Sequence, residues 1–227
     1  MRSEEEPDRE TVPVSVPRLS GAAILLILFG GAGAVCVEFG GPAAFEFDGP
    51  SMEPTLVDGD RFVVERYGLW LGLTPLARWG EPEQGDIVVL VSPWDQVHIV
   101  KRVVAVAGQH VVVDGDGNVS IDGRVTRERL GPCSDFPELR FPLADARDVH
   151  ADQGCTLYEE TLVGRRHRIV DSGHGARPTD VIVPDGHVFV MGDHRDRSND
   201  STNPFIGPVP LENIVGGYLA TYWEGGS

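Results

Sequence analysis

The sequence predicts a mainly β protein, and three observations support this fold class. Strand-like apolar runs alternate with turns rich in Gly, Asp and Pro over most of the chain. Apolar patterns with helical period and useful length are absent after the first forty residues. Apolar residues make up 41% of the 227 residues, which is enough to bury a core in one or two domains.

One helix is expected before the β region, over residues 19–37. This stretch has no charged residue, and at about 1.5 Å per residue its length approaches the roughly 30 Å hydrocarbon core of a bilayer. Three arginines precede it and the next basic residue is Arg61, so residues 1–18 are expected to be a cytoplasmic tail and the remainder to face outward. A cleavable signal peptide ending near 32–34 is the alternative.

Eight strands are expected in the remaining chain, and each is an apolar run bounded by turn residues. They are Ala44 to Phe47, Arg61 to Glu65, Asp86 to Val91, Val97 to Val106, His110 to Val113, Val119 to Ile121, Arg168 to Val170 and His187 to Met191. Residues 114–118, Asp-Gly-Asp-Gly-Asn, predict a hairpin turn. Their spacing resembles the start of a calcium loop, but the later Gly and Glu are missing, and no zinc spacing occurs either, so no metal is expected.

Residues 126–180 differ in character from the rest. Pro, Asp and Arg are frequent there and apolar alternation is weak, which predicts an inserted loop-rich subdomain in a core built from residues 41–125 and 181–227. Cys133 and Cys155 lie in this insertion. A domain outside the cytoplasm permits a disulfide between them, worth about 3 kcal/mol in the chain-entropy model. Two free thiols are the alternative.

The charge balance restricts the partners. The formal net charge is -16, which opposes binding to nucleic acids through long-range attraction because both molecules are negative. No nucleic-acid partner is therefore expected.

Lys101 is the only lysine of the chain and lies in the apolar run 97–106. In a regular strand its side chain points to the same face as Val97, Ile99 and Val103. Burial disfavours the charged amine and lowers the lysine pKa from about 10.4, a change that arginine cannot make. A snorkelling lysine at a strand edge is the alternative explanation.

Ser51 is the second candidate for chemistry. It follows a predicted strand and is flanked by Pro50 and Pro54, which stiffen the backbone on both sides. A hydroxyl held at such a turn is a nucleophile if a base lies beside it. The alternative is a serine that only caps its own turn.

A third segment, residues 192–201, alternates acids and arginines after a strand. Asp193 and Arg195 in it are candidates for a hydrogen-bonded clamp that supports the catalytic groups. A solvated, self-neutralising turn is the alternative.

Taken together, these segments resemble bacterial type I signal peptidases, the membrane-anchored Ser/Lys-dyad proteases. Four motifs occur in the family's order: Ser-Met-x-Pro-Thr-Leu, Gly-Asp-Ile-Val-Val, the Lys-Arg strand, and Gly-Asp-x-Arg-Asp-x-Ser-x-Asp-Ser. The resemblance covers the N-terminal segment and most of the outer core, but not the insertion. It implies an antiparallel β-sheet catalytic core outside the cytoplasm.

By this resemblance, Ser51 is the nucleophile and Lys101 the general base of a reaction that passes through an acyl-enzyme. Ser198 matches the serine that orients the lysine amine, and Asp200 matches the acid that steadies its loop. The backbone N–H of Ser51 is the expected oxyanion donor. Some members add a serine hydroxyl two positions earlier, where this chain has Gly49.

The chain departs from the family pattern in the third segment. His194 and Arg197 replace the usual Asn, and Thr202 replaces the usual Arg. A Ser-His-Asp mechanism through His194 is the alternative, but nothing in the sequence places His194 near Ser51. Six apolar residues match the family's pockets for small substrate side chains: Phe45, Phe47, Met52, Leu56, Ile99 and Val100. Several of these residues are equally explained as ordinary core.

The resemblance implies a single-pass enzyme of the bacterial plasma membrane that cleaves signal peptides from exported preproteins after Ala-x-Ala sites, with no cofactor. Its partners are preproteins and the lipid bilayer. Another Ser/Lys processing peptidase, of the pilin or repressor type, is one alternative. A membrane-tethered β domain that only binds partners is another.

Overall fold

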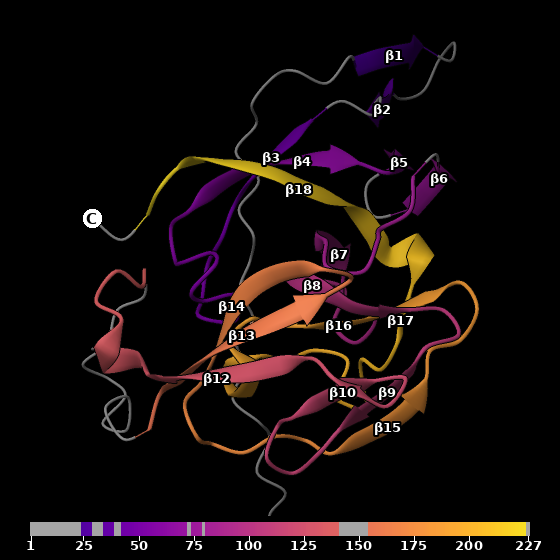
Figure 1. Cartoon of the computed structure of the whole chain (residues 1–227). Helices are drawn as coiled ribbons and strands as arrows, with labels where there is room; N and C mark the ends of the chain where they lie inside the picture. Colours follow the sequence, from indigo (N-terminus) through magenta and orange to yellow (C-terminus); the bar gives the residue numbers. More distant parts are fainter. Residues whose placement is uncertain are drawn as a thin grey trace, which may run out of the picture.

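The computed structural model describes residues 24–28, 34–38, 42–71, 74–78, 80–140 and 154–225. Strands in four sheets dominate these residues, and within each sheet the neighbouring strands pair antiparallel. The predicted fold class, mainly β with antiparallel sheets, is confirmed (Figure 1). The predicted tail 1–18 lies outside the described residues.

The largest sheet has seven strands in the order β17-β16-β8-β7-β18-β4-β3. In chain order these are β3 (Ala43–Glu46), β4 (Arg61–Arg66), β7 (Ile87–Val91), β8 (His98–Val106), β16 (His187–Met191), β17 (Val209–Pro210) and β18 (Ile214–Trp223). The sheet joins early and late segments of the chain, and Figure 1 shows β18 running along β4, which pairs with β3 on its other side.

Both faces of this sheet are buried at its centre. All five residues of β7 are buried, and they alternate between two apolar clusters. Val89 packs in one cluster with Phe62 and Met52, and Val88 packs in the other with Val190. A strand covered on both faces has no polar alternation, which explains the continuous apolar run of β7.

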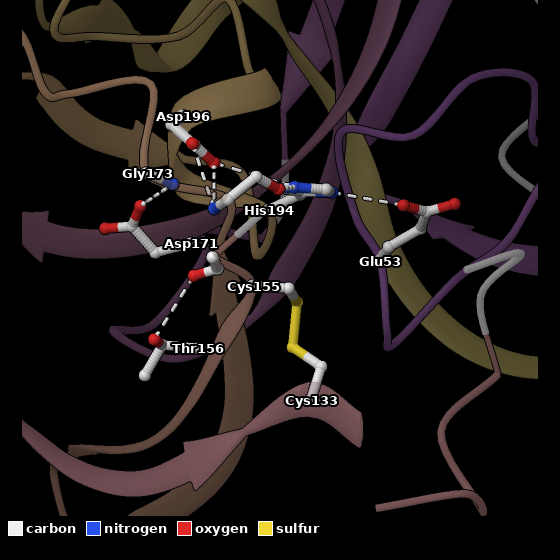
Figure 2. Close-up of a disulfide and its surroundings, with 10 residues drawn as sticks. Glu53, Cys133, Cys155, Thr156, Asp171, Gly173, His194 and Asp196 are labelled. Atoms are coloured by element: carbon white, nitrogen blue, oxygen red, sulfur yellow. Dashed lines mark hydrogen bonds and ion pairs between the residues drawn. A yellow bond between two sulfur atoms is a disulfide. The ribbon is translucent and has the colours of Figure 1, made fainter. Parts of the chain in front are cut away.

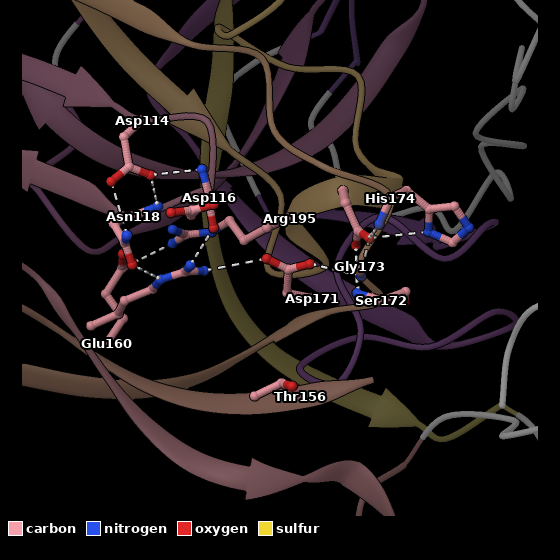
Figure 3. A network of polar contacts seen from close by, with 12 residues as sticks. Asp114, Asp116, Asn118, Thr156, Glu160, Asp171, Ser172, Gly173, His174 and Arg195 are labelled. Carbon is pink, nitrogen blue, oxygen red and sulfur yellow. Dashed lines mark hydrogen bonds and ion pairs between the residues drawn. The ribbon is translucent and has the colours of Figure 1, made fainter. Parts of the chain in front are cut away.

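A second sheet has the order β11-β10-β9-β15. Its strands are β9 (His110–Val113), β10 (Val119–Ile121), β11 (Arg124–Val125) and β15 (Thr179–Ile182). The predicted hairpin is confirmed, because β9 and β10 pair with Val113 opposite Val119. Asp114 shapes its turn by accepting hydrogen bonds from the Asp116 and Asn118 amides (Figure 3).

The third sheet lies wholly within the segment expected to be an insertion. It consists of β12 (Arg127–Pro132), β13 (Thr156–Leu162) and β14 (Arg165–Asp171). These strands are the salmon and orange ribbons of Figure 1. Cys133, in the short 3₁₀-helix η1 (Cys133–Asp135), is bonded to Cys155 beside β13 (Figure 2). Leu157 and Val170 pack around Cys133, so a small apolar cluster surrounds the disulfide.

The helix expected over residues 19–37 needs correction. The described parts of this segment are two paired strands, β1 (Ile24–Leu28) and β2 (Ala34–Glu38). They join β5 (Gly68–Leu71) and β6 (Thr74–Arg78) in a four-stranded sheet. Three glycines separate the two apolar runs in sequence, and glycine disfavours a continuous helix. Within the described residues, no helix is long and apolar enough to cross a membrane.

Candidate active site

Ser51 lies at the start of a tight turn after β3. Gly49 precedes it with a φ of +94°, a conformation that strongly favours glycine and explains why no side-chain donor stands there. The turn closes through hydrogen bonds from the Glu53 amide to the Pro50 carbonyl (3.1 Å) and from the Leu56 amide to the Met52 carbonyl (3.0 Å). Met52 and Leu56 are fully buried in the core, so the turn is anchored while Ser51 stays partly exposed.

Lys101 lies on β8 and reaches Ser51. Its Nζ is 2.8 Å from Ser51 Oγ and 3.0 Å from the Val100 carbonyl oxygen. Only 3% of Lys101 is exposed, and Val100 and Val103 beside it are buried. The strand alternation therefore points the amine into the protein, and the turn brings the hydroxyl to it although fifty positions separate the two residues.

This geometry suits proton transfer. The nitrogen and oxygen are within direct hydrogen-bond reach. Burial disfavours an ammonium ion relative to a neutral amine, and only a neutral amine can accept the hydroxyl proton. The pair can therefore act as a general base and an activated nucleophile.

The loop at 192–201 packs against both residues. Asp193 accepts hydrogen bonds from Arg102 Nε (2.8 Å) and Nη2 (2.6 Å), next to Lys101 in sequence, and another from Thr55 in the serine turn. Burial alone would raise the pKa of Asp193, but the neighbouring Arg102 guanidinium outweighs it and the pKa is lowered. Asp193 thus joins the lysine strand to the serine turn.

Asp200 fixes the shape of this loop. Its carboxylate accepts hydrogen bonds from the Gly192 amide (3.0 Å), the Thr202 amide (3.1 Å) and the Thr202 hydroxyl (2.8 Å). A Cβ at Gly192 would lie 2.3 Å from the Ser51 carbonyl oxygen and 2.4 Å from Ser198 Oγ. The loop therefore approaches the serine so closely that a side chain at Gly192 does not fit.

Ser198 lies beside Gly192, but its Oγ is buried without a hydrogen-bond partner among the described residues. The contact to the lysine amine that the resemblance implies is thus not formed in this structure. The hydroxyl has an unsatisfied donor and acceptor facing the loop interior.

The comparisons with known proteins agree on one family. The family model described as signal peptidase, peptidase S26, matches residues 20–223. The chain belongs to this family. It is 31% identical to a signal peptidase I of Pseudomonas fluorescens over 78% of this chain and 63% of the relative. It is 27% identical to a signal peptidase I of Aquifex aeolicus (strain VF5) over 80% of this chain and 76% of the relative.

A signal peptidase I of Pseudomonas aeruginosa is 30% identical, again over 78% of this chain and 63% of the relative. The chain therefore spans less than two thirds of the length of both Pseudomonas relatives. A solved structure of a signal peptidase I from Enterococcus faecalis V583 is 22% identical, with a TM-score of 0.34, over 61% of this chain and 97% of that chain. Family membership rests on the family model.

In this signal peptidase family member an open cleft runs past Ser51 and Lys101. Of the six apolar residues expected to bind substrate, Phe47, Ile99 and Val100 line this cleft. Phe45, Met52 and Leu56 are packed in the hydrophobic core and are not among the residues that line the cleft. The other lining residues are Asp48, Gly49, Pro50, Ser92, Asp95, Val97, His98, Asn199 and Ile206.

His98 gives the cleft an ionisable group that sequence reasoning missed. Burial, followed by the nearby Arg66 charge, lowers the pKa of His98 below 6.5. A neutral imidazole beside the Phe45 ring, 6.1 Å between centroids, keeps this wall of the cleft uncharged at neutral pH.

Arg195, an expected supporting residue, connects the loop at 192–201 to β13. Its Nε donates to the Gly192 carbonyl (3.1 Å), and its Nη2 donates to Glu160 on β13. Glu160 is fully buried and its pKa is lowered: burial alone would raise it, but Arg195 and His167 outweigh that effect. Sequence reasoning missed Glu160, because nothing local marks it as the partner of a residue 35 positions away.

A second missed contact links Glu53, inside the serine motif, to His194. His194 Nδ1 is 3.0 Å from Glu53 Oε2 (Figure 2), while its backbone amide donates to the Ser51 carbonyl (3.2 Å). The departure at His194 is thus paired with an acid two positions after the nucleophile. Among the described residues, no group of three or more His, Cys, Asp or Glu side chains is arranged to hold a metal ion.

Proposed function

We propose that the chain is a serine endopeptidase that removes N-terminal signal peptides from exported preproteins after Ala-x-Ala sites. The observation that carries the proposal is the 2.8 Å separation of Lys101 Nζ and Ser51 Oγ in a buried setting. Membership in the signal peptidase family supports the substrate class. In this proposal residues 41–125 and 181–227 form the catalytic core, and residues 126–180 are inserted into it.

The proposed reaction has two steps. Ser51 Oγ attacks the scissile carbonyl carbon while its proton passes to the neutral amine of Lys101. The protonated amine then gives that proton to the leaving peptide nitrogen, which leaves an acyl ester on Ser51. Water, deprotonated by Lys101, hydrolyses the ester and restores both residues.

The developing oxyanion needs a donor beside the nucleophile. We assign this role to the Ser51 backbone N–H, because Gly49 offers no hydroxyl. The small residues before the cleaved bond are assigned to the part of the cleft lined by Phe47, Ile99 and Val100. The preproteins are the partners, and the reaction uses no cofactor.

Attachment to the bacterial plasma membrane completes the proposal. Its support is membership in the signal peptidase family and the apolar, charge-free composition of residues 19–37, and the proposal places the catalytic core outside the cytoplasm. Alkaline extraction of bacterial membranes, followed by protease treatment of intact spheroplasts, tests this arrangement. Release of the full chain by alkali, or protection of the core in spheroplasts, would contradict it.

The activity is tested by incubating the purified full chain with a preprotein that bears one Ala-x-Ala site. We expect cleavage after the second Ala, identified by sequencing the new N-terminus, and none with Ser51→Ala. Ser120→Ala, on β10 in a different sheet, is the matched control and should cleave normally. Intact preprotein with the wild-type chain, or equal cleavage by Ser51→Ala, would overturn the proposal.

The pH dependence gives a second check. The rate of cleavage should rise with pH as the amine loses its proton, with an inflection well below the value of about 10.4 for a free lysine. A rate of cleavage that does not change with pH below the free-lysine value of about 10.4 would argue against an amine base.

A further inference from the structure

The contact between His194 and Glu53 is unusual because both side chains are buried. His194 is 2% exposed and Glu53 is 5% exposed. Among the described residues, the His194 ring is the hydrogen-bond partner of the Glu53 carboxylate. A buried carboxylate needs a hydrogen-bond donor, and losing that donor leaves the charge uncompensated. The buried His194–Glu53 contact is therefore costly to break, which favours this one arrangement of the two side chains.

The same residue also holds the nucleophile's backbone. The His194 amide donates to the Ser51 carbonyl (3.2 Å), and the His194 ring contacts Glu53, two residues further along the turn. Met52 lies between them, fully buried. His194 thus fixes the serine turn at two points, one through its backbone and one through its side chain.

The other nitrogen of the ring faces the insertion. His194 Nε2 is 2.6 Å from Ser172 Oγ and 3.5 Å from Asp196 Oδ1. The backbone of His194 also bridges to Val170, at the end of β14. The imidazole therefore connects the serine turn directly to the end of the inserted sheet.

Ser172, which contacts His194 Nε2, is itself held in place by Asp196. Asp196 accepts hydrogen bonds from the amides of Ser172 and His174, each 2.9 Å long. Burial alone would raise the pKa of Asp196, but these amides and the nearby His194 outweigh it and the pKa is lowered. An ionised Asp196 therefore holds Ser172 where its hydroxyl contacts the His194 ring.

Ser172, His194 and Glu53 form a chain of the serine–histidine–carboxylate kind, but the surroundings do not suit a second nucleophile. The Ser172 and His174 amides donate to Asp196, and the Gly173 amide donates to Asp171 (Figures 2 and 3). The backbone amides at Ser172 are thus occupied by carboxylates and not available to stabilise an oxyanion. The arrangement fits a positioning role.

We propose that His194 is a positioning residue that, through its Nδ1–H bond to Glu53, holds the Ser51 turn at the correct distance from Lys101. This inference rests on the proposed peptidase function. A misplacement of a reacting group by about 1 Å can cost on the order of 100-fold in rate, so the bond affects turnover more than substrate binding.

The two ring nitrogens can be separated by substitution. Asn places its amide nitrogen near the Nδ1 position and keeps the donor to Glu53, whereas Gln reaches toward the Nε2 position and loses it. With one Ala-x-Ala preprotein, His194→Gln and Glu53→Leu should lower kcat by roughly 10- to 100-fold with KM within about twofold. His194→Asn and Glu53→Gln, which keep the hydrogen bond, should restore most of this loss.

The double variant Glu53→Leu with His194→Gln should be no slower than the slower single variant, because both changes remove one contact. The matched control is an exposed pair, His110 and Asp180, whose Nε2 and Oδ1 lie 2.7 Å apart on β9 and β15. His110→Asn and Asp180→Asn should leave kcat unchanged. Circular dichroism at the assay temperature verifies that each variant is folded.

Hydrogen exchange of the wild-type and variant chains gives a readout independent of activity. Exchange at the Glu53 and Leu56 amides, which close the turn, should accelerate in His194→Gln and Glu53→Leu but not in His194→Asn. Unchanged kcat and unchanged exchange in His194→Gln would overturn the inference, as would an equal loss of kcat in His194→Asn. A wild-type chain that cleaves no preprotein would instead refute the proposed function, and the exchange pattern would still decide the inference.

Discussion

The Ser51 turn is held by two regions that use different interactions. On the side of Lys101, the large sheet surrounds the amine with buried apolar residues such as Val100 and Val103. On the side of the sheet formed by β12, β13 and β14, buried ionic contacts such as Arg195 with Glu160 hold the loop. Apolar burial suits an amine that must be neutral, whereas directional charged contacts suit a loop that must be positioned. Lowering the pH, adding a reductant or deleting a single charged side chain should therefore change the free energy of unfolding differently for the two regions.

The largest effect on stability is expected from breaking a buried ion pair of the loop. Asp193→Ala leaves Arg102 uncompensated, because the two side chains are 0% and 8% exposed. Removing one partner of such a pair costs about 3–5 kcal/mol in the free energy of unfolding. Denaturant unfolding followed by circular dichroism measures this cost.

The control for this prediction is an exposed pair at the edge of the large sheet. Arg61 and Glu46 are 47% and 34% exposed, so Glu46→Ala should cost no more than about 1 kcal/mol. Equal costs for the two substitutions would show that burial does not distinguish the regions.

The next effect is expected from the disulfide between Cys133 and Cys155. Replacing Cys133 and Cys155 by Ser opens a loop with a sequence separation of 22, which should lower the free energy of unfolding by about 3 kcal/mol. The double variant should also lose the dependence of thermal unfolding on added reductant. A wild-type chain whose unfolding is the same with and without reductant would contradict this prediction.

The smallest expected effect is on the pH dependence of the free energy of unfolding, which differs between the two regions. The pKa of His98, the first residue of β8 in the large sheet, is lowered below 6.5, so the unfolded chain binds this proton more readily than the folded chain. Its contribution to stability is therefore complete above pH 6.5 and declines as pH falls below that value. The effect should be under about 1 kcal/mol, because the ring is partly solvated.

Asp193 and Asp196 respond at lower pH, because their lowered pKa values keep their contributions intact until pH falls below the ordinary value of 3.8. Unfolding curves of wild type and His98→Gln between pH 7 and 4.5 measure the first window. Identical slopes for the two chains would refute the assignment to His98.

Most of the core could be predicted from sequence because its elements are locally patterned. The predicted run 97–106 is found as β8, starting at His98. Seven of the eight expected strands are present with ends within one residue, and the eighth, 168–170, is part of the longer β14 (Arg165–Asp171). The ten-residue β18 was missed. Its Gly216 interrupts the apolar pattern, and a Cβ there would lie 2.1 Å from the Glu65 carbonyl oxygen. The need for that glycine comes from the neighbouring strand and not from the local sequence.

The candidate site shows the same division. Ser51 and Lys101 could be proposed because each stands in a marked local setting, a proline-flanked turn and an apolar strand. Glu53 could not, because its partner His194 is 141 positions away. Long-range polar pairs carry no periodic signal, so the contacts that position the loop emerge only from the fold.

The central claim is that Lys101 is the base for Ser51, and one measurement tests it most directly. The value of kcat/KM for a single Ala-x-Ala preprotein is compared between wild type and Lys101→Arg at the same pH. Arginine keeps the charge but does not lose its proton, so we predict a loss of at least about 100-fold. Cleavage by Lys101→Arg at the wild-type rate would contradict the account.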